Sequence, residues 1–130
     1  MTQHMSHRPH PARMPDAPLI SVLMANLNGA SYIRHAIRAV LRQTHARLEL
    51  IIADDGSTDA SCAIIRDEMK DDPRITLLEG GASRGPAAAR NRAMAAASGD
   101  WIAIVDSDDI IHPERFARLL HAAHQLDADA

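Results

Sequence analysis

The amino-acid sequence predicts an α/β fold, a mostly parallel sheet flanked by helices, on three observations. Apolar segments of strand length alternate four times with segments of helical periodicity. The connections between them are short and rich in Gly, Pro, Asp and Asn. Apolar residues make up 46% of the 130 residues, but only 2% are aromatic. Aliphatic side chains therefore fill the core, as they do where helices pack on a sheet.

The predicted strands are continuous apolar runs. A run of this kind is typical of a strand buried on both faces, whereas a half-exposed strand alternates apolar and polar residues. Such a sheet needs a helical layer on each side. The four runs are LISVLMA (19–25), LELIIAD (48–54), RITLLE (74–79) and WIAIVD (101–106).

Four helices are predicted between and after these strands. The first has an apolar face and an arginine face. Ser57 or Thr58 is placed to cap the second, and Pro86 and Pro113 stand where the third and fourth begin. The predicted helical segments are 33–41, about 58–70, 87–97 and the residues that follow 113.

The amino-terminal segment and the composition narrow the class of protein. Residues 1–17 are polar and rich in Pro and His, so we expect a disordered leader before one domain over 18–130. No apolar run reaches the about 18 residues of a membrane span. The net charge of −3, without a basic patch, gives no reason to expect nucleic-acid binding. The single cysteine, Cys62, suits a reducing compartment, so we expect a cytoplasmic protein, free or at the cytoplasmic face of a membrane.

Polar residues capable of chemistry follow three of the predicted strands. The carboxyl ends of parallel strands meet at one edge of a sheet, and ligands of open α/β sheets bind there. We therefore expect the three clusters to converge on one site. They are Asn26 and Asn28 after the first strand, Asp54 and Asp55 after the second, and Asp106, Asp108 and Asp109 after the fourth.

The last of these clusters has the spacing of a metal site. Asp106 and Asp108 are two residues apart, so an extended chain places both side chains on the same face. Two adjacent carboxylates repel each other unless a cation lies between them. Their hard oxygens suit Mg²⁺ or Mn²⁺. The alternative is an acidic turn in which Ser107 and Asp109 cap the next helix.

The other polar residues have both a structural and a binding interpretation. We expect Asp54 to form an Asx turn, whereas Asp55 favours contact with an N–H or hydroxyl donor of a ligand. The Gly-rich loop before the third helix, with Arg90 close behind it, favours a diphosphate. The alternative for Arg90 is a place on a solvated helix face.

Four blocks in this order resemble the family 2 glycosyltransferases, which have the GT-A fold. They are SVLMANLNGASYI, LELIIADDGSTD, GPAAARNRAMAAASGDWIAIVDSDD and HPERFARLL, and the match covers about residues 18–123. The resemblance implies the N-terminal, nucleotide-sugar-binding part of such an enzyme, a Rossmann-like GT-A half without the acceptor half. It also implies inverting transfer of a sugar from a nucleoside-diphosphate sugar, a UDP-sugar before others, to an acceptor glycan or other hydroxyl compound, with Mg²⁺ or Mn²⁺.

The resemblance also assigns roles to residues of this sequence. Asp55 matches a residue that contacts the base. Asp106, Ser107 and Asp108 match the DXD motif, which binds ribose, diphosphate and metal. Asp108 is then the direct metal ligand, and Asp106 lies nearer the ribose or the sugar. The segment that frames the nucleobase is Ala25, Asn26, Leu27 and Asn28.

Two features depart from the family pattern. Ala25 and Leu27 stand where the family has a proline and an aromatic ring, so stacking of a ring on the base is given up. No residue through Ala130 matches the catalytic base, which we expect beyond Ala130. The alternative function is a nucleotide-sugar-binding module or remnant without turnover. Without the acceptor half we also expect an exposed sheet edge that favours self-association.

Overall fold

The computed structural model describes residues 4–7 and 18–129. In this part the sheet has the order β1-β5-β2-β3-β4, in which β2 pairs in parallel with β3 and β5, β3 pairs in parallel with β4, and β1 runs antiparallel to β5. The mostly parallel α/β fold is confirmed. The elements are β1 (His4–His7), β2 (Ile20–Asn26), α1 (Ile33–Leu41), β3 (Leu48–Asp54), α2 (Ser61–Asp71), β4 (Ile75–Glu79), α3 (Pro86–Ala96), β5 (Trp101–Ile104) and α4 (Arg115–Asp129).

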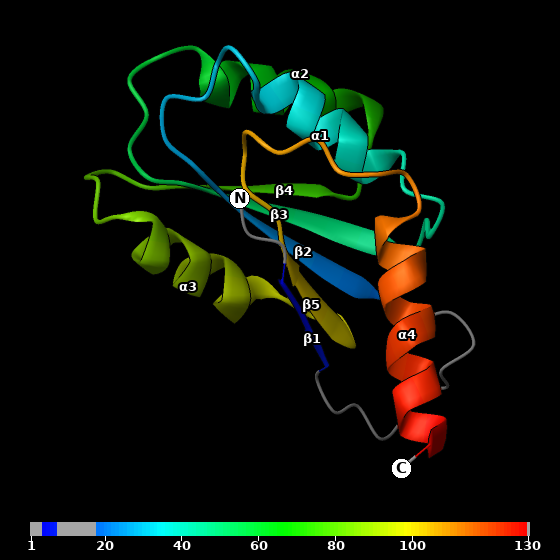
Figure 1. Cartoon of the computed structure of the whole chain (residues 1–130). Helices are drawn as coiled ribbons and strands as arrows, with labels where there is room; N and C mark the ends of the chain where they lie inside the picture. Colours follow the sequence, from blue (N-terminus) through cyan, green and yellow to red (C-terminus); the bar gives the residue numbers. More distant parts are fainter. Residues whose placement is uncertain (1–3, 8–17, 130) are drawn as a thin grey trace.

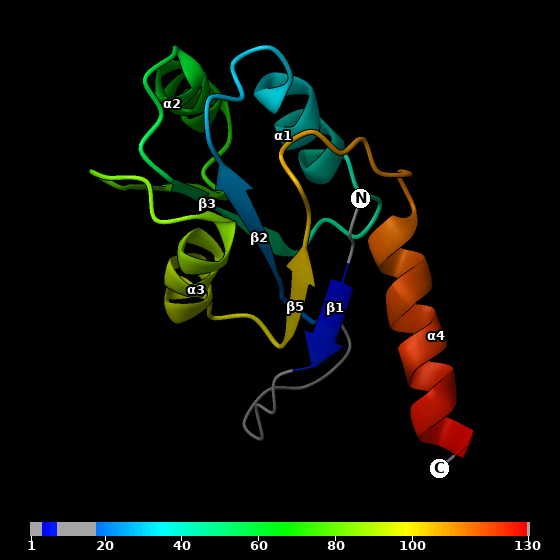
Figure 2. The ribbon, with the colours of Figure 1, turned by 60° about the vertical axis from the view of Figure 1, so that its left-hand side comes forward.

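The sheet is the middle layer of three. Figures 1 and 2 show α1 and α2 on one face and α3 on the other. Alternate residues of each strand serve the two sides, because successive side chains of a strand point to opposite faces. Val22 and Met24 belong to the core cluster that includes residues of α1 and α2. Leu23 belongs to the smaller cluster with Ala89 and Ala93 of α3.

The two central strands are buried along their length, as their apolar runs predict. Every residue of β2 except Ala25, and every residue of β3 except Glu49, is buried. β3 begins and ends where the sequence places it, at 48 and 54, and β2 lies one residue later than predicted. This central pair defines where the loops at the carboxyl edge begin.

A polar network closes the opposite, amino-terminal edge of these strands. Ser21 Oγ donates to Glu49 Oε2, and Ser98 N donates to the same oxygen at 2.7 Å. Gly99 N donates to Ser21 Oγ at 2.7 Å. The chain between α3 and β5 is thereby held against β2 and β3, with its buried polar groups paired as burial requires.

The prediction of a disordered leader is wrong for His4–His7. These four residues form β1, which pairs with β5 in the register His4 to Ile104 and His7 to Trp101. The hydrogen bonds between paired strands join backbone groups. A polar segment can therefore pair with the free backbone N–H and C=O groups of an edge strand without having an apolar pattern. β1 therefore covers the β5 edge. The rest of the predicted leader, 1–3 and 8–17, lies outside the described residues.

The predicted cap of the second helix is wrong, and the fourth helix begins two residues after Pro113. α2 begins at Ser61, beyond the reach of Ser57 or Thr58, and its first N–H group donates to Asp59 Oδ1 at 2.9 Å. α4 begins at Arg115, and its Phe116 N–H donates to Gln43 Oε1. By contrast, α3 begins at Pro86, as predicted.

Replacing Gly99 tests the closure at the amino-terminal edge. A Cβ at this position would lie 2.6 Å from Ser21 Oγ and 2.7 Å from Leu19 O, so backbone would have to move. We expect Gly99→Ala to lower the free energy of unfolding by about 1–3 kcal/mol, measured by urea denaturation. The control is Gly81→Ala, because a Cβ there would meet no atom within 4 Å. Equal free energies of unfolding for the two variants would show that a Cβ at residue 99 can be accommodated beside Ser21 and Leu19.

Candidate functional site

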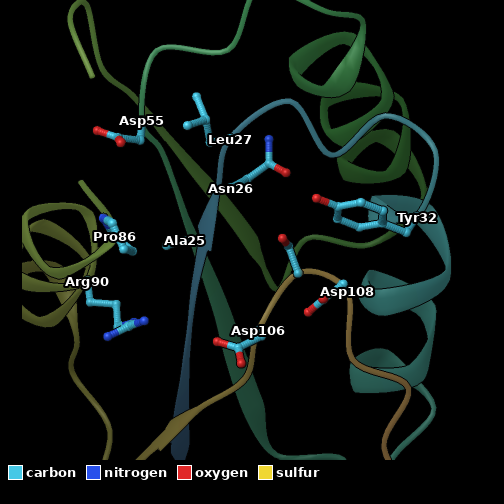
Figure 3. A pocket seen from close by; sticks show the side chains of 10 residues that line it. Ala25, Asn26, Leu27, Tyr32, Asp55, Pro86, Arg90, Asp106 and Asp108 are labelled. Atoms are coloured by element: carbon cyan, nitrogen blue, oxygen red, sulfur yellow. The ribbon is translucent and has the colours of Figure 1, made fainter. Parts of the chain in front are cut away.

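An open pocket of about 380 Å³ lies at the carboxyl edge of the sheet (Figure 3). It is bounded by the ends of β2 and β5, the residue after β3, and the amino-terminal turns of α1 and α3. The sequence predicts a site at this edge from the rule for parallel sheets. The lining residues are Ala25, Asn26, Leu27, Tyr32, Asp55, Pro86, Arg90, Asp106, Ser107 and Asp108.

The pocket gathers eight of the nine site residues that the sequence predicts; the exception is Asn28. Tyr32 and Pro86 also line it and were missed. Pro86 carried a signal, since it opens α3 directly after the Gly-rich loop. Tyr32 carried only a weak one, its place one residue before an apolar helix face. The structure thus brings these residues together, and their roles toward a ligand stay predictions.

Asn28 holds two loops together. Its backbone is left-handed, with φ 52°, a conformation that Asn tolerates better than most residues. Its Oδ1 accepts from the backbone N–H groups of Thr58 and Asp59 at 2.8 and 3.3 Å, and its own N–H donates to Ser57 Oγ at 2.8 Å. Asn28 therefore fixes the loop after β2 against the loop after β3.

Asp54 has the structural role that its Asx pattern predicts. Its buried carboxylate accepts from Ser57 N at 2.8 Å, Ser57 Oγ at 2.6 Å and Asn26 Nδ2 at 2.9 Å. Burial alone would raise the pKa of this carboxyl, but the hydrogen bonds from Ser57 and Asn26 outweigh it and lower the pKa. Burial, followed by the Asp54 charge, raises the pKa of the nearby Cys62 thiol to about 11, so Cys62 stays protonated at neutral pH.

Asp55 fastens the Gly-rich loop to the pocket. Its Oδ1 accepts from Arg84 N at 2.8 Å, and its Oδ2 accepts from Ser83 Oγ at 2.8 Å and Gly85 N at 3.0 Å. These bonds, led by the one from Arg84, lower the pKa of Asp55. Asp55 is therefore an anion that fixes the entry to α3 and retains unused acceptor capacity on Oδ1.

The acidic cluster after β5 divides between the pocket and the interior. Asp106 and Asp108 line the pocket, whereas Asp109 is only 1% exposed. Neither carboxylate oxygen of Asp109 has a hydrogen-bond partner within the described part of the chain. Burial, and then the charges of Asp106 and Asp108, raise the pKa of Asp109. Because α4 begins at Arg115, the alternative in which Ser107 and Asp109 cap it is not realised.

The oxygen ligands in the pocket suit a divalent cation whose remaining ligands would come from water and a substrate phosphate. In the described ranges no three His, Cys, Asp or Glu side chains gather as a closed metal site. Asp106 and Asp108 face the same pocket as two carboxylates, with Ser107 between them. Mg²⁺ and Mn²⁺ are commonly held in this way, by one or two carboxylates with water and phosphate oxygens completing the shell.

The fold and the pocket define an α/β domain with an open pocket at the carboxyl edge of a mostly parallel sheet. The chain belongs to glycosyl transferase family 2, whose sequence profile matches residues 21–130. This confirms the family that the sequence blocks resemble, and its fold is GT-A. Within the described residues no helix is both long enough and apolar enough to cross a membrane.

The chain is similar to bacterial proteins, several of which are named as glycosyltransferases. An uncharacterized glycosyltransferase of Haemophilus influenzae is 40% identical over 80% of this chain and 42% of its own length. The succinoglycan biosynthesis protein ExoO of Rhizobium meliloti is 36% identical over 92% of this chain and 34% of its own length. The chain thus spans well under half of the length of these relatives.

Two solved structures are similar to this one and contain ligands. The mannosyltransferase PcManGT of Pyrobaculum calidifontis, in complex with GDP-Man and Mn²⁺, has a TM-score of 0.67 and 28% identity over 81% of this chain and 31% of its own. TarS of S. aureus, in complex with UDP-GlcNAc, has a TM-score of 0.70 and 28% identity over 84% of this chain and 31% of its own.

Replacing Asp55 tests its hold on the loop. In Asp55→Asn we expect faster amide hydrogen exchange at Arg84 and Gly85, because both N–H groups lose a charged acceptor. In the parent the lowered pKa keeps these bonds intact at neutral pH, and they are lost only as the pH falls through it. Protection should therefore persist below the pH at which an unfolded aspartate is protonated.

The control for this measurement is Asp67→Asn, which removes an exposed partner of Arg34 far from the loop along the chain. Amide exchange at Arg84 and Gly85 should be unchanged in it. Unchanged exchange in Asp55→Asn itself would show that the loop is held by other contacts.

Proposed function

We propose that this chain is the donor-binding part of an inverting glycosyltransferase that transfers a sugar from a nucleoside-diphosphate sugar to an acceptor hydroxyl, with Mg²⁺ or Mn²⁺ in the donor site. One observation carries the proposal. An anionic base-reading carboxylate, a guanidinium and a pair of metal-type carboxylates line one pocket at the carboxyl edge of the sheet. They are Asp55, Arg90, Asp106 and Asp108.

The nucleobase fits the side of the pocket formed by Asp55 and its apolar neighbours. The unused lone pair on Asp55 Oδ1 accepts an N–H group of the base. Ala25 and Leu27 give this region an apolar wall, and Leu27 is 46% exposed and thus available for contact. Discrimination by a buried hydrogen bond of this kind is stronger than discrimination by apolar shape.

The diphosphate fits between Arg90 and the acidic residues. Arg90 contributes a fixed positive charge, and the α3 amino terminus at Pro86 adds the positive end of a helix dipole. Asp106 and Asp108 would repel a diphosphate unless a cation lay between them and its oxygens. When bound, that cation would neutralise charge that develops on the departing nucleoside diphosphate.

The similar structures support this class of donor. PcManGT is in complex with GDP-Man and Mn²⁺, and TarS with UDP and with UDP-GlcNAc. The donors are nucleoside-diphosphate sugars in both cases, but the bases differ. We put a UDP-sugar first for this chain and include guanine nucleotides in the test.

The proposal places the acceptor site and the catalytic base outside this pocket. The pocket carboxylates Asp55, Asp106 and Asp108 are all assigned to the donor and the cation, so none is left to deprotonate an acceptor hydroxyl. We place that base beyond Ala130, on a segment that also binds the acceptor glycan or other hydroxyl compound. Action in the cytoplasm or at the cytoplasmic face of a membrane, and self-association through a sheet edge, remain predictions.

Calorimetric titration tests the donor and metal site. We expect UDP or GDP to bind in the presence of Mn²⁺ and at least tenfold more weakly without it. Asp108→Asn, which removes the charge of an exposed pocket residue, should abolish the effect of the metal. The matched control is Asp71→Asn at the end of α2, with binding unchanged. Nucleotide binding that responds neither to Mn²⁺ nor to Asp108→Asn would refute the site.

A second titration tests the diphosphate position. Arg90→Gln should weaken UDP binding about tenfold or more, because a hydrogen bond to a charged group contributes about 1.5–3 kcal/mol. Uridine, which has no phosphate, should bind the variant and the parent equally. Arg42→Gln, on an exposed arginine at the end of α1, is the control. Equal losses for UDP and uridine in Arg90→Gln would mean that Arg90 shapes the pocket rather than binding the diphosphate.

A further inference from the structure

Tyr32 is the one aromatic residue among those that line the pocket, and it is the only tyrosine of the chain. It is the residue before α1, and its side chain is directed from there into the pocket (Figure 3). The residue is 36% exposed. None of the interactions found within the described residues involves its hydroxyl.

The side-chain amide of Asn26, next to this ring, is fixed in one orientation. Its Nδ2 donates to Asp54 Oδ1 at 2.9 Å and to Ser57 Oγ at 3.3 Å. A carboxylate only accepts when ionised, so the nitrogen must face Asp54 and the oxygen must face away. This Oδ1 is buried, and no donor within the described residues reaches it.

Gly29 shows how closely the ring and this oxygen approach each other. A Cβ at Gly29 would lie 2.3 Å from Asn26 Oδ1 and 2.9 Å from Tyr32 Cε2. Both groups therefore occupy the space above Gly29, where any side chain would collide with them. In Figure 3 the Asn26 oxygen and the Tyr32 ring lie on the same side of the pocket. Asn26 Oδ1 is thus enclosed by residues of the β2–α1 connection while Asn26 itself lines the pocket.

A buried acceptor without a donor is unfavourable, and pairing it removes that penalty. The ring beside it belongs to a side chain that is partly exposed and held by no hydrogen bond that the described residues provide. Rotation of this side chain would open Asn26 Oδ1 to a donor group in the pocket. The oxygen can only accept, so the group that it takes must be an O–H or an N–H.

We propose that Tyr32 is a gate over Asn26 Oδ1, and that this oxygen accepts a hydrogen bond from a ribose hydroxyl of the bound nucleotide once the ring has turned aside. The inference rests on the proposed function. Asn26 lies on β2, between β3, which leads to Asp55, and β5, which leads to Asp106. The ribose likewise lies between the base and the diphosphate. Phosphate oxygens carry no donor at neutral pH, and the N–H group of the base is already assigned to Asp55, which leaves the ribose hydroxyls as the donors at this place.

The movement can be followed directly because the chain has one tyrosine. Incorporation of 3-fluorotyrosine gives a single ¹⁹F resonance, which reports on the surroundings of residue 32. With Mg²⁺ present, we expect the nucleotide that binds more tightly, UDP or GDP, to shift this resonance. Inorganic pyrophosphate with Mg²⁺ should leave it in place, because pyrophosphate lacks the ribose.

Calorimetry of the same protein identifies which ribose hydroxyl donates the hydrogen bond to Asn26 Oδ1. Either the 2′-deoxy or the 3′-deoxy analogue should bind about tenfold more weakly than the parent nucleotide, the ratio that about 1.4 kcal/mol gives. In Tyr32→Ala the oxygen is open from the start, so the nucleotide should bind at least as tightly as in the parent protein, and the loss with the deoxy analogue should persist.

Each contrary result has a distinct meaning. Nucleotide binding with an unmoved ¹⁹F resonance would overturn the gate and leave the proposed function intact, and this readout does not depend on any variant folding. Equal affinity for both deoxy analogues and the parent nucleotide would overturn ribose recognition. Equal weakening of all nucleotides in Tyr32→Ala would make Tyr32 a plain wall of the pocket. Absence of any nucleotide binding would overturn the proposed function and the gate together.

Discussion

The carboxyl edge of the sheet depends on Asp54, whose buried carboxylate and carbonyl bind groups from four segments. The carboxylate accepts from Asn26 at the end of β2 and from Ser57 in the loop after β3. The main-chain oxygen accepts from Gly80 N after β4 at 3.0 Å and from Arg92 Nη2 of α3 at 2.6 Å. Burying this charge is unfavourable by itself and is sustained because every partner is a well-placed donor. Loss of the bonds from Asn26 or Ser57 would leave the charge under-satisfied, whereas loss of those from Gly80 and Arg92 would leave the main-chain oxygen without a donor.

This constraint explains why adjacent acidic residues have opposite roles. Asp54 is turned inward and Asp55 lines the pocket; after β5, Asp108 lines the pocket and Asp109 is turned inward. Asp54 is the last residue of β3, and successive residues of a strand face opposite sides. Asp108 instead lies in a turn, in which Asp109 N donates to Asp106 O at 3.0 Å. Burial raises the pKa of Asp109, whereas for Asp54 burial is outweighed by the hydrogen bonds from Ser57 and Asn26, which lower its pKa. The carboxylates that line the pocket are therefore positioned by the end of β3 on one side and by the turn after β5 on the other.

The sequence predicted most of this arrangement, and the residues it missed share a physical cause. Continuous apolar runs mark buried strands, and the edge rule then gathers Asp55, Asp106 and Asp108 without any knowledge of contacts. Tyr32 enters the pocket only because the chain folds closely over Gly29, a tertiary approach that no local pattern encodes. Asn28 was predicted to frame a base, but a left-handed backbone turns it toward the neighbouring loop. β1 is a non-local backbone pairing, which leaves little trace in side-chain pattern.

The charge balance of the pocket links the two ligands of the proposed function. The three hydrogen bonds that Asp55 accepts already commit much of its charge to the loop of residues 83–85. The charges that face a diphosphate are then two carboxylates against one guanidinium and one helix amino terminus. A nucleoside diphosphate and a divalent cation each remove the repulsion that opposes the other, so each must raise the affinity for the other by the same factor. Under the proposed function, binding of donor and metal would therefore be coupled through Asp106 and Asp108.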